Sequence, residues 1–456
     1  MSLTVVPAIG DIYQDQQQES QQERIEQDQH KQDQHKQDQH QIKNDQHQPS
    51  EGCGGGNSGG GGDHGDGGLG GGGADLPRCL GAVLPERTHG LRRAHAADVS
   101  TLERLEQPAE HARRPSHVVV HKDNHSGRGL TGLPEPRDGF SPQQIDLGRL
   151  LFFDPILSSD HSVSCATCHN PQQGFGDGMG RSIGIKGNIQ QRSAPSLWNS
   201  AFLSNFFWDA RATTLEEQAQ SPLFSAQEMG NTPTNIVQSL YDVESYQSLF
   251  KQAYPKQKEA ISVQNIITSL AAFQSSLVSL NSRYDQYAHG YHKALNKDEI
   301  AGLNVFRSFV ARCSQCHTPP LFTNQQIAVI GTPEPAGLPR DIGAERTYNS
   351  PVLRGGFKVP TLRNIALTAP YMHSGRFKTL REAAEFYTGG RGHAVPENEE
   401  LLLHWHISEP NLTSEEIDRL VDFMKTLSDE SLLPVTPKML PSGLPFKHME
   451  SFHEQS

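Results

Sequence analysis

Two short stretches decide how this chain folds: Cys165-Ala166-Thr167-Cys168-His169 and Cys313-Ser314-Gln315-Cys316-His317. Both have the pattern C-x-x-C-H and are called the first motif and the second motif below. In each, two thiols three residues apart can form thioethers to haem vinyl groups, and the adjacent histidine then lies under the iron. A lone C-x-x-C also suits a zinc site or a redox dithiol, but a zinc site needs its two pairs close together. Because 148 residues separate the motifs, the sequence predicts two covalently bound c-type haems.

Composition separates a folded part from a long extension. Hydrophobic residues make up only 34% of the 456 residues, which is low for a globular protein. Fifteen glutamines lie between Gln14 and Gln48, and fifteen of the 22 residues from 52 to 73 are glycine. Neither tract can bury enough apolar surface to offset the entropy lost on ordering it. We therefore expect residues 1–115 to be a disordered Gln/His-rich and Gly-rich extension.

The extension carries two features that could have a function. His30, His35 and His40 recur with a period of five, and a solvated spacer explains them better than weak metal capture. Cys53 opens the glycine tract and resembles the lipid-modified start of a bacterial lipoprotein, although no hydrophobic signal core precedes it. Because haem of this kind is attached outside the bacterial cytoplasm, we expect a periplasmic protein, with a lipid tether at Cys53 as an option.

The charge of the chain limits its partners. Lys and Arg total 40 and Asp and Glu total 52, so the net charge is −12. Such a charge argues against nucleic acid and mildly favours basic partners. The sequence holds no run of about 18 apolar residues, so it predicts no membrane-spanning helix.

Helix signals predict a mainly α fold. Helix starts are indicated by an N-cap followed by proline or by a capping box, at Ser141-Pro142, Thr213 with Glu216, and Thr413 with Glu416. Apolar residues at helical spacing predict helices over about 263–284 and 298–311. Strand signals are sparse, and long Gly- and Pro-rich loops occupy 171–196 and 318–360.

Further motifs, in a fixed order, resemble one protein family. They are Gly148-Arg149-Leu150-Leu151-Phe152-Phe153-Asp154-Pro155, Arg192-Ser193-Ala194-Pro195-Ser196-Leu197, Phe207-Trp208-Asp209-Ala210-Arg211, Leu215-Glu216-Glu217-Gln218, Pro360-Thr361-Leu362-Arg363-Asn364-Ile365 and Thr368-Ala369-Pro370-Tyr371-Met372-His373-Ser374-Gly375. With the two haem motifs, they resemble the bacterial di-haem cytochrome c peroxidases and their MauG-type relatives over about residues 140–430. The resemblance implies two cytochrome c-like haem domains with long loops. The peroxidatic domain is expected at 134–285 and the electron-transfer domain at 286–433, followed by a tail at 434–456.

The resemblance places the chemistry at the first haem. Glu228 lies 59 residues after His169, where the family keeps the glutamate that moves a proton between the peroxide oxygens. Gln218 is expected beside it as a second polar group. The cytochrome c peroxidase branch closes this iron with a histidine on a loop that corresponds to Gly184-Ile185-Lys186-Gly187, and no histidine occurs there. The first haem is therefore expected to be open without prior reduction.

The resemblance also assigns two aromatic residues to electron transfer. Trp208 is expected between the haems as a relay, although any of the three tryptophans could simply fill a core. Tyr387 stands 17 residues after Pro370, where the cytochrome c peroxidase branch has the methionine that ligates the second iron. A phenolate there would lower the potential of the iron. The alternative is that Tyr387 only packs and that Met372 or His373 binds this iron.

A calcium ion between the domains is a further expectation from the family. Its site corresponds to Ser193, Thr368 and Pro370. Ser193 stands where the family normally has asparagine, and a hydroxyl is a weaker calcium ligand than an amide oxygen.

Together these features predict a di-haem c-type peroxidase. Hydrogen peroxide would be reduced at the first haem, with electrons delivered through the second from a small cytochrome c or a cupredoxin. One alternative is a MauG-type enzyme that oxidises a side chain of a partner protein through a bis-Fe(IV) state. The others are a non-catalytic di-haem electron carrier, which would leave Glu228 without a task, and a haem-based sensor or scaffold.

Overall fold

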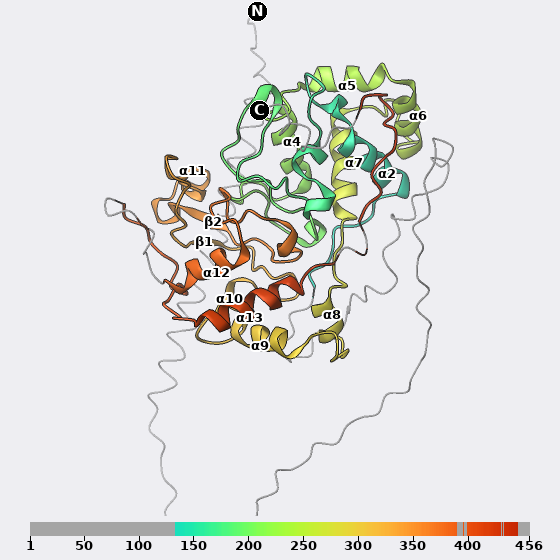
Figure 1. Cartoon of the computed structure of the whole chain (residues 1–456). Helices are drawn as coiled ribbons and strands as arrows, with labels where there is room; N and C mark the ends of the chain where they lie inside the picture. The colour runs from blue at the N-terminus through green and yellow to red at the C-terminus, as the bar shows by residue number, and fades with distance from the viewer. Residues whose placement is uncertain (1–132, 390–394, 396–398, 430, 432, 446–456) are drawn as a thin grey trace, which may run out of the picture. The chain divides into compact units, whose positions relative to one another are not determined.

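The computed structural model describes residues 133–389, 395, 399–429, 431 and 433–445 (Figure 1). The expectations for residues 1–115, including Cys53 and the histidine repeat, lie outside this part of the chain. The described residues are mainly helical and contain one two-stranded sheet, which confirms the expected fold class. Within them, no helix has the length and apolar character needed to cross a bilayer.

Two groups of elements follow one another along the chain (Figure 1). The first lobe contains α2 (Pro142–Phe153), α3 (Cys165–Cys168), α4 (Leu215–Phe224), α5 (Pro233–Tyr241), α6 (Glu244–Ala253) and α7 (Val263–Ser275). The second lobe contains α8 (Arg283–Ala288), α9 (Lys297–Phe306), α10 (Cys313–Cys316), α11 (Ala344–Tyr348), α12 (Leu380–Thr388) and α13 (Ser414–Lys425), with the strands β1 (Ile327–Val329) and β2 (Gly356–Lys358). Short 3-10 turns (η3 to η8) lie at Pro155–Leu157, Pro171–Gln173, Ile185–Gly187, Ser200–Phe202, Pro351–Leu353 and Ile365–Leu367.

Each lobe is built on a pair of closely packed helices. In the first lobe α2 crosses α7 at Gly148, where an added Cβ would lie 1.8 Å from the backbone oxygen of Ser269. In the second lobe α9 crosses α13 at Gly302, where an added Cβ would lie 1.9 Å from the backbone oxygen of Arg419. Only glycine permits such close contact. Each of these pairs belongs to a separate apolar core, and one haem motif lies between the two helices of each pair in the sequence.

The three predicted helix starts are present in the structure, and one of them lies a residue later than predicted. Ser141 and Thr413 are N-caps as predicted, and Thr413 forms the expected capping box with Glu416. The capping box of α4 lies one residue later than predicted, at Thr214 with Glu217. Both Thr213 and Thr214 precede a glutamate by three residues, so the pattern alone does not choose between them.

Two predicted helices end earlier than their apolar spacing suggested. The helix expected over about 263–284 stops at Ser275, and α8 begins separately at Arg283. The hydroxyl of Ser276 donates to the backbone oxygen of Phe273, and such local bonds compete with continued helix. The helix expected to reach 311 ends at Phe306.

Candidate functional site

The first motif forms one turn of helix with its histidine at the end. The turn is α3, and His169 is its C-cap. The Nδ1 atom of His169 lies 2.9 Å from the backbone oxygen of Phe175. Donation of a proton to that carbonyl fixes the ring and leaves Nε2 as the atom that can ligate a metal.

The second motif repeats this arrangement. His317 is the C-cap of α10, and its Nδ1 atom lies 3.2 Å from the backbone oxygen of Phe322 and 3.1 Å from that of Pro360. Pro360 follows β2 closely, so the small sheet helps to orient this histidine. Both motifs therefore present an imidazole nitrogen whose opposite side is held by main-chain oxygens.

Protein surrounds much of the cysteine and histidine side chains of both motifs. Their cysteine and histidine side chains keep some accessible surface, yet burial raises the pKa of Cys165 and of Cys313 to about 12 and lowers the pKa of both histidines. Desolvated thiol and imidazole groups are suited to contact with a large apolar group. The thiols are free, and the histidines favour the neutral form that binds iron. The two motifs thus fit a covalently bound haem each.

Glu228 is brought to the first motif by the turn after α4. Its main-chain N–H donates to the backbone oxygen of Ser225, and its side chain is half-buried. Desolvation raises the pKa of this carboxyl, while Arg211 and a hydrogen bond from Ser225 act in the opposite direction. Burial raises the pKa of the Cys168 thiol, and the carboxylates of Asp177 and Glu228 add to the increase. The segment 183–185 contacts both groups, since the Cys168 sulfur lies 4.0 Å from the backbone oxygen of Ile183 and the N–H of Ile185 donates to that of Glu228. A desolvated carboxyl with a raised pKa is suited to general acid–base work.

Gln218 lies half-buried in α4, ten residues before Glu228. Within the described residues, no hydrogen bond joins its side chain to Glu228, so its role beside the glutamate stays a prediction.

The loop without a histidine packs directly on Glu228. Ile185 is buried, and its N–H donates to the backbone oxygen of Glu228 at 2.8 Å. Gly184 lies against the preceding residue, since an added Cβ would lie 2.0 Å from the backbone oxygen of Gln227. The buried Ile185 holds this loop beside the candidate acid–base group, and none of the four residues is a usual iron ligand.

Gly184→Ala tests this contact. The new methyl group must displace the loop or the turn that carries Glu228, and overpacking of this kind costs about 1–3 kcal/mol. We expect a lower unfolding temperature and slower peroxide turnover, with the second haem unchanged in its optical spectrum. Gly187→Ala is the control for stability, because an added Cβ there meets nothing within 4 Å, although its positive φ adds some strain. Equal turnover in wild type and Gly184→Ala would contradict the contact.

Trp208 joins the two lobes. Its Nε1–H donates to the backbone oxygen of Ser193 in the first lobe at 2.9 Å. Its own backbone oxygen accepts from the N–H of Lys358 in β2 at 2.6 Å. Its ring centre lies 6.5 Å from that of His373, which also belongs to the second lobe. The tryptophan is therefore fixed on both sides, as a relay between two cofactors would require.

His373 is already engaged by other groups. The side chain is buried, its Nε2 atom lies 2.8 Å from a carboxylate oxygen of Glu334, and its ring stacks on Phe357 with centres 3.7 Å apart. These contacts make it a poor alternative ligand for the second iron. Sequence reasoning missed Glu334, because it lies in an irregular loop and no motif marks it.

Tyr387 is brought to the second motif by α12. The side chain is half-buried, and burial raises the pKa of its hydroxyl well above the usual range. The thiols of Cys316 and Cys313 add to this increase, so the hydroxyl lies near both. A phenol there stays protonated until a metal ion displaces the proton. The position predicted from the spacing to Pro370 thus coincides with the second motif.

The proposed calcium residues are held by hydrogen bonds within the protein. The hydroxyl of Ser193 donates to the backbone oxygen of Met372 at 3.1 Å, and its backbone oxygen accepts from Trp208. The hydroxyl of Thr368 donates to the backbone oxygen of Ile365 at 3.2 Å, while Pro370 is half-buried nearby in the sequence. The hydroxyl groups of Ser193 and Thr368 thus have partners within the protein. In the family the ion is held partly by backbone oxygens of the segment that corresponds to Thr368 and Pro370, so calcium stays a prediction.

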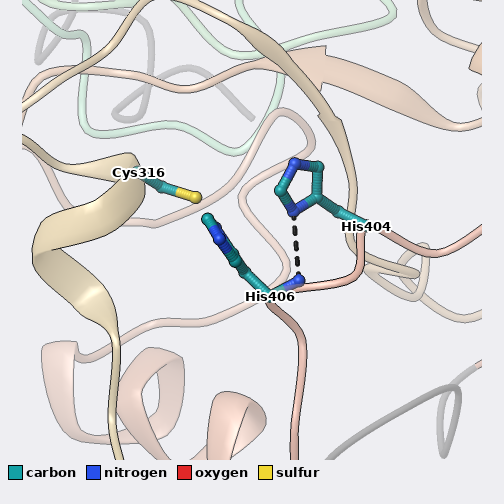
Figure 2. Close-up of side chains that lie close together, drawn as sticks. All are labelled: Cys316, His404 and His406. Atoms are coloured by element: carbon teal, nitrogen blue, oxygen red, sulfur yellow. Dashed lines mark hydrogen bonds between the residues drawn. The ribbon is translucent and has the colours of Figure 1, made fainter. Parts of the chain in front are cut away.

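A further cluster beside the second motif was missed from the sequence. Figure 2 shows Cys316 with His404 and His406, whose ligating atoms lie within 4.8 Å of one another. The N–H of His406 donates to Nδ1 of His404 at 3.3 Å. The pair His-x-His could have marked this segment. Cys316 is one of the thiols expected to bind haem, and a sulfur bound in that way would not be available to another metal. The two histidines lie beside the second motif.

Comparison with known proteins gives consistent similarities. Residues 142–293 match a family model described as di-haem cytochrome c peroxidase. The chain is 33% identical over 308 residues to the methylamine utilization protein MauG of Methylorubrum extorquens, which covers 67% of this chain and 84% of that protein. It is 32% identical over 311 residues to a cytochrome c551 peroxidase of Pseudomonas aeruginosa, covering 66% and 85%. Among solved structures, it resembles a MauG-like protein associated with microbial copper homeostasis, with a TM-score of 0.62, 33% identity and coverage of 67% and 96%.

Proposed function

This chain belongs to the di-haem cytochrome c peroxidase family, which includes MauG, and from that premise we propose that it reduces hydrogen peroxide at the first motif with electrons passed from the second. Membership makes it an oxidoreductase of the peroxidase class and implies two c-type haems. The observation that carries the proposal is the position of Glu228 beside the first motif, with the raised pKa that an acid–base group needs.

When bound, each haem supplies an iron that can exchange electrons with peroxide or with a donor. The protein supplies the proton transfer. Glu228 in its carboxylate form accepts a proton from one oxygen of hydrogen peroxide and returns it to the other oxygen, which leaves as water. With two electrons and two protons, one peroxide yields two waters. The desolvation that raises the pKa of Glu228 brings it closer to the working pH of such a step.

Trp208 is proposed to carry electrons between the lobes. Its indole N–H is bonded to a carbonyl oxygen, which is a weak base, so the ring can lose and regain an electron while keeping its proton. Its hydrogen bonds to Ser193 and Lys358 limit its motion relative to both motifs.

Trp208→Phe should therefore slow electron delivery and spare peroxide binding. We expect a fall of roughly tenfold or more, equivalent to about 1.4 kcal/mol in the barrier. Rapid-mixing experiments with the prereduced protein would follow each haem separately. The exposed Tyr241 in α5 provides a control, as Tyr241→Phe. Unchanged transfer in the Trp208 variant would remove it from the route.

The electron source defines two branches of this function. A small cytochrome c or a cupredoxin is the proposed donor for a peroxidase that protects against peroxide. A side chain of a partner protein is the source in the MauG-type branch. The position of Tyr387 near the second motif and the absence of histidine from 184–187 favour MauG-like ligation, and they leave the partner open. The periplasm remains the proposed location, and a calcium ion remains a prediction.

A steady-state assay tests the function. The purified haem-loaded protein is mixed with peroxide and reduced cytochrome c, and donor oxidation is followed against a heat-denatured sample. Donor oxidation that depends on peroxide supports a peroxidase. A non-catalytic carrier would instead show two six-coordinate haems with no high-spin ferric band and no turnover.

A further inference from the structure

Lys358 lies on a segment that contacts both Trp208 and the second motif. It lies in β2 opposite Ile327 of β1. Its main-chain N–H donates to the backbone oxygen of Trp208 at 2.6 Å. Two residues further on, the backbone oxygen of Pro360 lies 3.1 Å from Nδ1 of His317. A single short segment thus touches both the tryptophan and the proximal histidine.

Protein surrounds most of the side chain of Lys358. It keeps some accessible surface, yet desolvation lowers its pKa to about 8. Within the described residues it takes part in no ion pair. This combination indicates an ammonium group that protein surrounds but no anion neutralises.

The carboxylates near this junction are bound elsewhere. Asp209 and Asp341 pair with Arg192 at 2.8 and 2.6 Å. Glu334 pairs with His373, whose ring stacks on Phe357. Because neighbouring residues of a strand point to opposite faces, Lys358 points away from the face on which Phe357 meets His373.

Buried cations in proteins are nearly always paired. The cofactor expected at the second motif brings carboxylates of its own, since haem carries two propionate groups. We propose that Lys358 forms an ion pair with a propionate of the haem held by the second motif. This inference rests on the proposed function, because that function requires the haem.

The pair would give Lys358 a positioning role. Its ammonium holds the haem periphery while its main chain holds Trp208, so one residue sets the separation of relay and cofactor. A positive charge beside the haem also stabilises the reduced iron, which has one positive charge fewer than the oxidised iron. Lys358 therefore raises the potential of the second haem.

Redox titration of the haem-loaded protein tests the pair. In Lys358→Met, the ferric/ferrous equilibrium of the second haem should shift at least about tenfold towards ferric, which corresponds to about 1.4 kcal/mol. Lys358→Arg keeps the charge and should restore most of the shift. Lys378→Met, at an exposed position, is the control and should leave both haems unchanged. An unchanged second haem in fully loaded Lys358→Met would overturn the proposal.

If Lys358→Met does not load haem, a second measurement tests the ion pair. Resonance Raman spectra of wild type and Lys358→Arg report the propionate bending band of each haem. A band that moves for the second haem supports the pair, and identical spectra contradict it. Neither measurement uses peroxide, so a failed ion pair is distinguished from a failed peroxidase, which only turnover assays reveal.

Discussion

Glu228→Gln is expected to lower peroxide turnover by at least about a hundredfold, the usual scale of general acid–base help, while both haems stay attached. Glutamine keeps the shape of the side chain and cannot accept the peroxide proton. Half-buried Glu228 lies near the Cys168 thiol, where desolvation raises its pKa. Steady-state kinetics with cytochrome c as donor, together with haem spectra, measure the effect.

The pH profile separates this role from a structural one. The carboxylate form accepts the first proton, so kcat/KM should fall as the pH drops through the raised pKa of Glu228 and that limb should disappear in the glutamine variant. Glu259→Gln, at an exposed loop position, is the matched control and should keep the wild-type profile. Undiminished turnover in Glu228→Gln would remove the residue from the mechanism.

Tyr387→Phe is expected to change the second haem more than any other single substitution. Axial ligands set haem potentials over a range of about 0.8 V, and loss of an anionic ligand raises the potential. Phenylalanine preserves the aromatic packing of α12 but offers no ligand, so the iron should also bind an added small ligand such as cyanide. Tyr387→Met should raise the potential as well and favour donor-fed peroxidase behaviour.

Redox titration and optical spectra of the Tyr387 variants measure this. The exposed Tyr291 offers a control, as Tyr291→Phe. If the second haem of Tyr387→Phe keeps its spectrum and potential, Tyr387 only packs. The ligand would then be another residue such as Met372, because His373 is held by Glu334 and Phe357.

The parts of the site that the sequence predicted are those with short-range patterns. Each C-x-x-C-H motif fits on one helical turn, so its geometry follows from spacing alone. The positions of Glu228 and Tyr387 came from distances along a family pattern, and the fold brings both near the expected motifs. Helix starts were also predictable, because caps are local, to within one residue at α4.

The missed features depend on contacts between distant segments. Lys358 and Trp208 are joined by a main-chain hydrogen bond across 150 residues, which no local pattern encodes. His404 reaches the second motif because its N–H donates to the backbone oxygen of Val329 in β1. At the early end of α7 the hydroxyl of Ser276 bonds to the backbone, an effect that apolar spacing does not reveal.

Stopped-flow mixing of the fully oxidised protein with hydrogen peroxide tests the central claim most directly. No residue at 184–187 is a usual iron ligand, and Ile185 anchors that loop beside Glu228. The ferric protein should therefore show a high-spin band and react with stoichiometric peroxide at once, without a supplied electron. A reaction that appears only after partial reduction would contradict the account, because another residue would then close the first iron.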